Sequence, residues 1–249
     1  MIKSFTTAAF GLALALSPLS LNAAELKVLA GGAMGATLKD LGPKFEAATG
    51  NKLDISYAGT PELIRQATSG EPFDVAVVPV DVFMNAAAKA KFVAGPTIDI
   101  ARVGFGVAVR AGAPKPDVST PEAFKATLLA GKSVTFYPES ASGAFVLKTF
   151  DRLGIGEAMK AKSKPLPLDK IAAAVANGDV ELGVFLTNIL NAPGVELVGQ
   201  FPGELQNDLV FTSAVAADSK NAAAAKAFID YLRTPEAMAV IKAKGMKAG

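Results

Sequence analysis

The sequence predicts an α/β protein with two lobes, mostly parallel sheets flanked by helices, and a ligand cleft between the lobes. Short apolar stretches alternate with longer segments whose apolar residues recur at helical spacing. This alternation occurs as two similar sets, and the roughly 225 residues after position 24 are enough for two cores. We expect one lobe to contain residues 25–101 and 208–249 and the other residues 102–207.

Residues 1–24 are predicted to form a cleaved secretory signal peptide. Lys3 supplies a positive charge, the apolar run at 10–16 is too short to span a bilayer, and small residues at 23–24 suit a signal peptidase. We therefore expect a mature protein in the periplasm.

The first lobe begins with strand-helix pairs. Leu38, Leu41 and Phe45 are spaced as on one face of a helix, and Gly50 is suited to end it. The pattern predicts strands at 26–30, 53–57, 74–79 and 104–110 and helices at 34–48, 61–68 and 82–90.

The second set begins at Thr120, a natural N-cap followed by Pro121 in the first helical turn. Beyond that helix we expect strands at 133–137, 181–186, 195–198 and 208–217, and helices at 143–153, 168–176, 222–232 and 235–244. The chain then crosses between the lobes near residues 102 and 207, which places a cleft between them.

Composition excludes several kinds of chemistry. The chain has no cysteine and no histidine, which removes disulfides, thiolate sites, the usual zinc ligand and every Ser-His-Asp triad. Its net charge is +2 and its basic residues are scattered, so we expect no nucleic-acid partner. We assign no cofactor, no metal-binding residue and no catalytic residue, and these absences favour binding over hydrolysis.

Four strand-to-helix junctions carry small or polar residues that suit an anion. Helices begin beyond the carboxyl ends of the strands and leave N–H donors unsatisfied there. We expect Thr60 and Asp169 to be N-caps and Ser142 to lie at a helix start. Each motif alone is ordinarily a structural cap, so the hypothesis depends on the whole set. The junction residues assigned to the ligand are Ala33, Met34, Thr60, Ser140, Ser142, Gly143 and Leu168.

Several of these stretches resemble the periplasmic molybdate-binding proteins of ABC importers, which are type II solute-binding proteins. The similar segments are 30–35, 57–63, 70–75, 225–232 and 234–237, and the resemblance covers the mature chain. It implies the two-lobed type II periplasmic binding fold, hinge closure over a small anion, an ABC permease as partner and a monomeric receptor.

The departures from that family lie at the pocket. Ala33 stands where the family has a serine, and Leu186 where it has a tyrosine, while Thr60 keeps a hydroxyl. Each lost hydroxyl costs about 1–3 kcal/mol of binding if its partner stays buried and unpaired. We therefore place an organic carboxylate ahead of a molybdate-like oxyanion.

Two further residues suggest how a carboxylate is held. Arg102 lies near the expected hinge, where a guanidinium can grip a carboxylate with two hydrogen bonds, and Arg102→Lys is then expected to weaken binding about tenfold. Tyr137 ends a strand facing the cleft. A solvated arginine and a packing tyrosine are the alternatives.

The competing function is a periplasmic isomerase or lyase acting on a carboxylate. The same resemblance extends to aconitate isomerase, and Glu139 is the candidate proton shuttle for such an enzyme.

Overall fold

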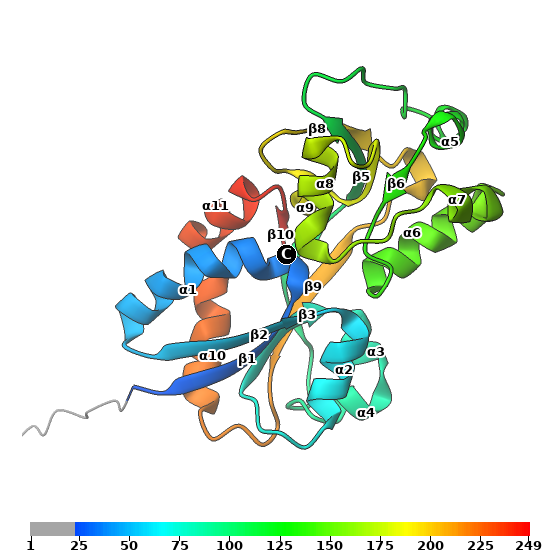
Figure 1. The fold of residues 1–249 in the computed structure, drawn as a ribbon. Helices are drawn as coiled ribbons and strands as arrows, with labels where there is room; N and C mark the ends of the chain where they lie inside the picture. Colours follow the sequence, from blue (N-terminus) through cyan, green and yellow to red (C-terminus); the bar gives the residue numbers. More distant parts are fainter. Residues whose placement is uncertain (1–22) are drawn as a thin grey trace, which may run out of the picture.

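The computed structural model describes residues 23–249 as two lobes, each built on its own sheet (Figure 1). The first lobe contains a six-stranded sheet with the order β10-β4-β9-β3-β1-β2, and the second a four-stranded sheet with the order β6-β7-β5-β8. The two-lobed α/β architecture is confirmed. The strands are β1 (Glu25–Gly31), β2 (Lys52–Ala58), β3 (Val75–Pro79), β4 (Ile98–Val103), β5 (Phe105–Arg110), β6 (Val134–Thr135), β7 (Leu182–Leu186), β8 (Val195–Gln200), β9 (Leu209–Val215) and β10 (Lys247–Ala248).

Both sheets are mixed, so the expectation of mostly parallel sheets is wrong. β1 is parallel to β2 and β3, and β6 is parallel to β7. β9 is antiparallel to β3 and β4, β10 is antiparallel to β4, and β5 is antiparallel to β7 and β8. The strands of each parallel pair are joined through segments that contain helices, as a parallel pair requires a crossover connection.

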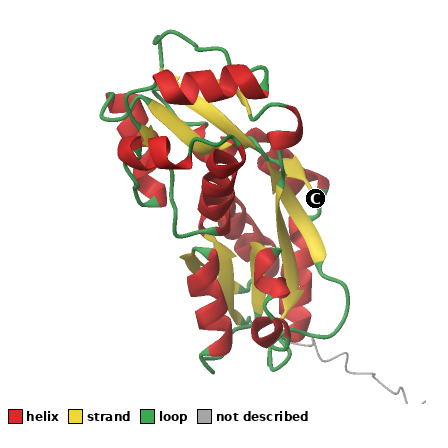
Figure 2. Ribbon diagram, turned by 90° about the vertical axis from the view of Figure 1, so that its right-hand side faces the viewer, coloured by secondary structure: helices red, strands yellow, loops and turns green. Residues whose placement is uncertain are grey.

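Helices cover the faces of both sheets (Figure 2). None of those in the described part has the length and hydropathy of a membrane span. The α-helices are α1 (Gly35–Thr49), α2 (Thr60–Thr68), α3 (Asp81–Met84), α4 (Ala86–Lys89), α5 (Pro121–Ala130), α6 (Ala141–Arg152), α7 (Gly156–Lys162), α8 (Ile171–Asn177), α9 (Thr187–Leu190), α10 (Ala222–Leu232) and α11 (Pro235–Ala243), with 3-10 turns η1 (Gly32–Met34), η2 (Leu168–Lys170) and η3 (Gly203–Leu205).

Local signals placed several helix ends correctly. Thr120 caps α5 by accepting a hydrogen bond from the Ala123 N–H, and Gly50 ends α1 in the left-handed conformation with φ 76°. The helix expected at 82–90 is two short helices, because the Asn85 side chain accepts from the Ala88 N–H and starts a new one. The residue pattern did not predict β4, β10, α7 and α9.

The chain crosses between the lobes next to paired strands. Val103 at the end of β4 pairs with Leu209 in the first lobe, and Phe105 at the start of β5 pairs with Leu186 in the second. The Gln206 side-chain amide bonds both the N–H and the C=O of Phe105 at 2.9 Å, which ties the two crossing segments together. β4 continues to Val103 within the first lobe's sheet, two residues beyond the expected boundary, and the lobe boundaries at 25–101 plus 208–249 and at 102–207 stay a prediction.

A small core cluster holds the start of α2 on the first sheet. Leu63, in the first turn of α2, is fully buried and belongs to a cluster with Leu29, Val78 and Phe92. A larger cluster extends through both lobes, and its largest buried side chains are phenylalanines such as Phe45, Phe105 and Phe211. Burial of these apolar side chains holds the helices on the sheets and so determines where the helix starts lie.

The described range begins at residue 23, so the signal peptide expected at residues 1–24 lies almost entirely outside it.

Candidate ligand-binding site

A cavity of about 590 Å³ lies between the two lobes. Its walls come from the starts of α1, α2 and α6, from η2, from the ends of β2 and β7 and from the start of β9. The sequence-predicted residues that line it are Ala33, Thr60, Tyr137, Ser140, Ser142, Leu168 and Leu186. Met34, Gly143 and Arg102 are not in its lining.

At the first helix start, η1 presents backbone to the cavity. Gly31, Gly32 and Ala33 line it, whereas Met34 is fully buried in the core. The tight 3-10 turn directs the Met34 side chain into the core, and Met34 is not in the cavity lining. A Cβ on Gly32 would lie 2.9 Å from the Leu168 side chain of the second lobe. Glycine therefore permits close approach of the lobes here.

Thr60 is the first residue of α2 and not its N-cap. Gly59 is the N-cap residue, and no side chain caps this helix. The Thr60 Oγ1 atom instead accepts a hydrogen bond of 3.4 Å from the Ala141 N–H at the start of α6. The hydroxyl thus links the two lobes across the cavity and keeps its own proton for donation.

At the start of α6, the two serines have different roles. Ser140 is the N-cap, since its Oγ accepts from the Gly143 N–H and donates to the Tyr137 carbonyl, each at 3.0 Å. Ser142 is 4% exposed and lines the cavity, and within residues 23–249 its hydroxyl has no hydrogen-bond partner. Gly143 is required by packing, because a Cβ there would lie 2.0 Å from the Tyr137 carbonyl oxygen.

The fourth junction differs from the expected helix start. η2 precedes α8, which begins at Ile171, and Asp169 caps neither of them. Asp169 is exposed and pairs with Lys170 at 3.2 Å. Two prolines, Pro165 and Pro167, precede this turn and favour extended backbone, so the helix starts later than the polar residue suggests.

Arg102 does not lie at the cavity, which overturns its assignment as a carboxylate ligand. It belongs to β4, where its guanidinium pairs with Asp99 at 2.5 Å on the exposed part of the first lobe. Arg102 lies near the crossing between the lobes, as expected. Within the sheet of the first lobe it pairs with Val210 of β9 and Lys247 of β10.

We now expect Arg102→Lys to leave ligand affinity unchanged within twofold, because the substituted group does not line the cavity. Calorimetric titration of both forms measures this. A tenfold loss of affinity with unchanged melting temperature would return Arg102 to the site.

Several lining residues were not predicted from the sequence. Lys39, one turn into α1, lines the cavity together with Tyr57, which ends β2. Ile189, Leu209 and Phe211 form part of the apolar wall. Helical spacing after Gly35 could have placed Lys39 on the cavity side, whereas β9 reaches the site only through long-range strand pairing.

The two tyrosines are neutral hydrogen-bond donors. Burial raises the pKa of Tyr57, and burial together with the nearby Glu139 carboxylate raises the pKa of Tyr137. Both phenols line the cavity and keep their protons at neutral pH. The cavity therefore offers hydroxyls of Thr60, Ser142, Tyr57 and Tyr137.

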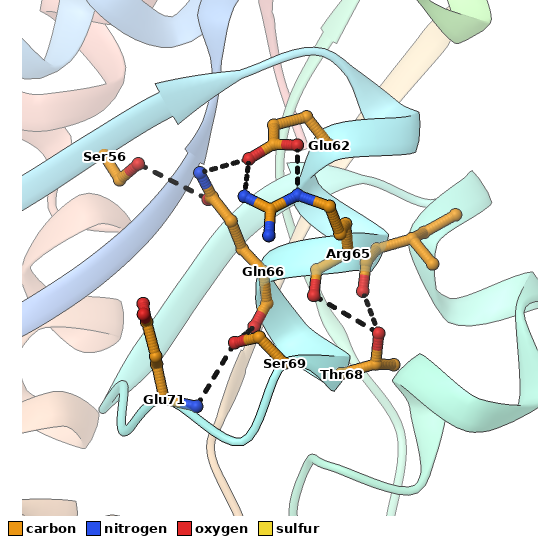
Figure 3. A network of polar contacts seen from close by, with 8 residues as sticks. Ser56, Glu62, Arg65, Gln66, Thr68, Ser69 and Glu71 are labelled. Carbon is orange, nitrogen blue, oxygen red and sulfur yellow. Dashed lines mark hydrogen bonds and ion pairs between the residues drawn. The ribbon is translucent and has the colours of Figure 1, made fainter.

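The outer face of α2 is occupied by its own polar network (Figure 3). Glu62 accepts two hydrogen bonds from Arg65 and one from Gln66, and Gln66 in turn accepts from Ser56 on β2. The guanidinium of Arg65 is therefore engaged at the surface, and it is not in the cavity lining.

Direct contacts join the lobes around the cavity. Asn188 at the start of α9 donates from Nδ2 to the Ala33 carbonyl at 2.8 Å. A Cβ on Gly59 would lie 2.5 Å from the Glu139 carbonyl oxygen. With the Thr60–Ala141 hydrogen bond, these contacts define a closed arrangement of the lobes.

Thr60→Val is expected to weaken ligand binding by about 1–2 kcal/mol, because it removes the hydroxyl and keeps the shape. Thr60→Ser keeps the hydroxyl and is the matched control. Since Thr60 is not the N-cap, neither change should lower the melting temperature by more than a few degrees. Equal affinity of the valine and serine forms would show that the hydroxyl does not contact the ligand.

Two lobes closed over a cavity at converging helix starts define the class of two-lobed periplasmic binding proteins. Residues 26–247 match the family described as bacterial extracellular solute-binding protein, and the chain belongs to this family.

Known relatives and structures agree with this assignment. An aconitate isomerase from Pseudomonas sp is 33% identical over 99% of this chain and 98% of its own length. The molybdate-binding protein ModA of Azotobacter vinelandii is 30% identical over 90% of each chain. The solved structure of the periplasmic molybdate-binding protein of Azotobacter vinelandii has a TM-score of 0.73 at 19% identity, covering 90% of this chain and 99% of that one.

Proposed function

We propose that this protein is a periplasmic receptor that captures a small anion and delivers it to an ABC permease. The observation that carries the proposal is the wall formed by Thr60 and Ser142 at the starts of α2 and α6. Helix starts present N–H donors and a partial positive charge, and the two buried hydroxyls add donors at the same place.

The family supports transport as the purpose of this binding. Molybdate-binding relatives match nearly the whole chain, and the apposed lobes suit hinge closure over a ligand. The ligand is an organic carboxylate or a molybdate-like oxyanion. We propose that the receptor acts as a monomer.

A thermal-shift screen tests the proposal, since a ligand that binds only the folded state raises the melting temperature. The panel contains molybdate, tungstate, sulfate, di- and tricarboxylates, neutral sugars and divalent cations. We expect an anion to give the largest shift and calorimetry to confirm one site. Tight binding of a sugar or a cation, with no response to any anion, would contradict the proposal.

A second candidate is an isomerase acting on a tricarboxylate, favoured by the 33% identity to aconitate isomerase. Glu139 does not support it, because this residue is exposed and does not line the cavity. The titratable side chains that the described residues place in the lining are Lys39, Tyr57, Tyr137 and Asp169.

Proton NMR of cis-aconitate incubated with the protein separates the two functions. Accumulation of the trans isomer, lost in Tyr137→Phe, would support the isomerase. An unchanged spectrum together with saturable binding would support the receptor alone.

A further inference from the structure

The cavity is much larger than a compact oxyanion. Its volume of about 590 Å³ leaves room for a ligand larger than a tetrahedral oxyanion, which has only one central atom and four oxygens. A ligand with a carbon skeleton can therefore enter.

One part of the cavity is apolar. It is lined by Leu186, Ile189, Leu209 and Phe211. This apolar part lies beside the crossing between the lobes, since Leu186 pairs with Phe105 and Leu209 with Val103. These side chains offer no hydrogen bonds to an oxyanion. A ligand with a hydrocarbon skeleton binds more favourably against them, because the contact buries apolar surface on both sides.

The donors of the cavity are spread over several elements. Thr60 lies on α2, Ser142 on α6, Tyr57 at the end of β2 and Tyr137 after β6. Ser142 is 4% exposed and, among residues 23–249, has no hydrogen-bond partner for its hydroxyl. Because Ser142 lines the cavity, a ligand oxygen there can pair with its hydroxyl. Donors on α2, α6, β2 and the loop after β6 suit a ligand with acceptor oxygens at more than one place.

Lys39 provides a positive charge at the cavity. It is exposed, lies one turn into α1, and forms no ion pair with any residue that the structure describes. The neighbouring Asp40 is already paired with Lys244 at 2.6 Å, and Asp169 across the cavity is paired with Lys170. The Lys39 ammonium is therefore free to receive an anionic group of the ligand.

From this arrangement we propose that the ligand is a small organic acid with more than one carboxylate, which rests on the proposed function as an anion receptor. One carboxylate binds at the starts of α2 and α6, the carbon skeleton covers the apolar wall, and a second carboxylate pairs with Lys39.

Calorimetric titration with four probes tests this ligand class: propane-1,2,3-tricarboxylate, butanedioate, butanoate and molybdate. We expect the tricarboxylate and the dicarboxylate to bind at least tenfold more tightly than butanoate or molybdate. Molybdate as the tightest of the four would overturn the ligand class and leave the anion receptor standing. No binding by any anion, with binding of a sugar or a cation, would overturn both.

Two variants test which side chains contact the second carboxylate and the carbon skeleton of the ligand. Lys39→Met should weaken tricarboxylate binding about three- to fivefold at low salt, an effect that salt reduces, and leave butanoate within twofold. Lys44→Met is the matched control, because Lys44 lies on the same helix but pairs with Glu236 outside the cavity. Ile189→Asn should weaken binding of the tricarboxylate and the dicarboxylate about fivefold. Because Ile189 also packs against the core, the melting temperature of the ligand-free variant is measured to separate a loss of stability from a loss of binding. Equal losses for butanoate and the tricarboxylate in Lys39→Met would overturn the second-carboxylate contact.

Discussion

Gly59→Ala is expected to weaken ligand binding at least tenfold while the protein stays folded. The added Cβ would lie 2.5 Å from the Glu139 carbonyl oxygen of the other lobe, and a backbone atom cannot turn aside as a side chain can. Overpacking of this kind costs about 1–3 kcal/mol, and this cost destabilises the closed arrangement of the lobes. The backbone at Gly59 is extended with φ −78°, so alanine brings no strain within its own lobe.

Two further variants separate closure from helix capping. Gly59→Ser adds the same Cβ but supplies a favourable N-cap, so it should restore any lost stability and still bind weakly. Gly42→Ala lies within α1 and outside the cavity lining, where the new Cβ is 3.5 Å from Leu53, and it should bind normally.

Calorimetry gives the affinities of these glycine variants, and small-angle scattering with and without ligand reports closure. Wild-type affinity and compaction in Gly59→Ala would show that the lobes need not approach this closely.

Asp74→Ala is expected to lower the free energy of unfolding by about 3 kcal/mol. The Asp74 carboxylate is buried and accepts hydrogen bonds from the Lys27 N–H at 2.9 Å, the Ser219 hydroxyl at 2.6 Å and the Asn221 amide at 3.3 Å. Hydrogen bonds to a charged acceptor contribute about 1.5–3 kcal/mol each, and their removal leaves the partners unpaired.

Urea unfolding measures the loss of stability in Asp74→Ala. Asp218→Ala, an exposed carboxylate in the loop before α10, is the control and should change stability by less than about 0.5 kcal/mol. Ligand affinity should stay unchanged, because Asp74 precedes β3 whereas Pro79, at the other end of that strand, lines the cavity. A loss below 1 kcal/mol would mean that water replaces these hydrogen bonds.

The segment at 70–75 shows how a sequence resemblance and a structural role can coincide. Its likeness to molybdate-binding proteins pointed to the family, and the structure shows that Asp74 in this segment joins β1 to the loop before α10. Sequence alone could not reveal this role, because Ser219 and Asn221 lie far along the chain.

The sequence by itself determined the two-lobed α/β class, several of the helix starts and the solute-binding family. Apolar periodicity, a proline after Thr60 or Thr120, and a glycine at position 50 are local signals, and local backbone physics acts on them directly. The absence of histidine and cysteine was also decisive, since composition alone removes the classes of chemistry that need an imidazole or a thiol.

Only the tertiary structure decided which residue at each junction meets the cavity. Capping preference does not distinguish Gly59 from Thr60, or Ser140 from Ser142, and a shift of one residue turns a helix position by about 100°. Packing between the lobes determined which residue of each junction faces the cavity. It also brought Lys39, Leu209 and Phe211 to the same cavity from distant segments. Arg102 lies outside the lining because it belongs to β4, where it pairs with Asp99. Contacts between segments far apart in sequence carry this information, and a local pattern does not contain it.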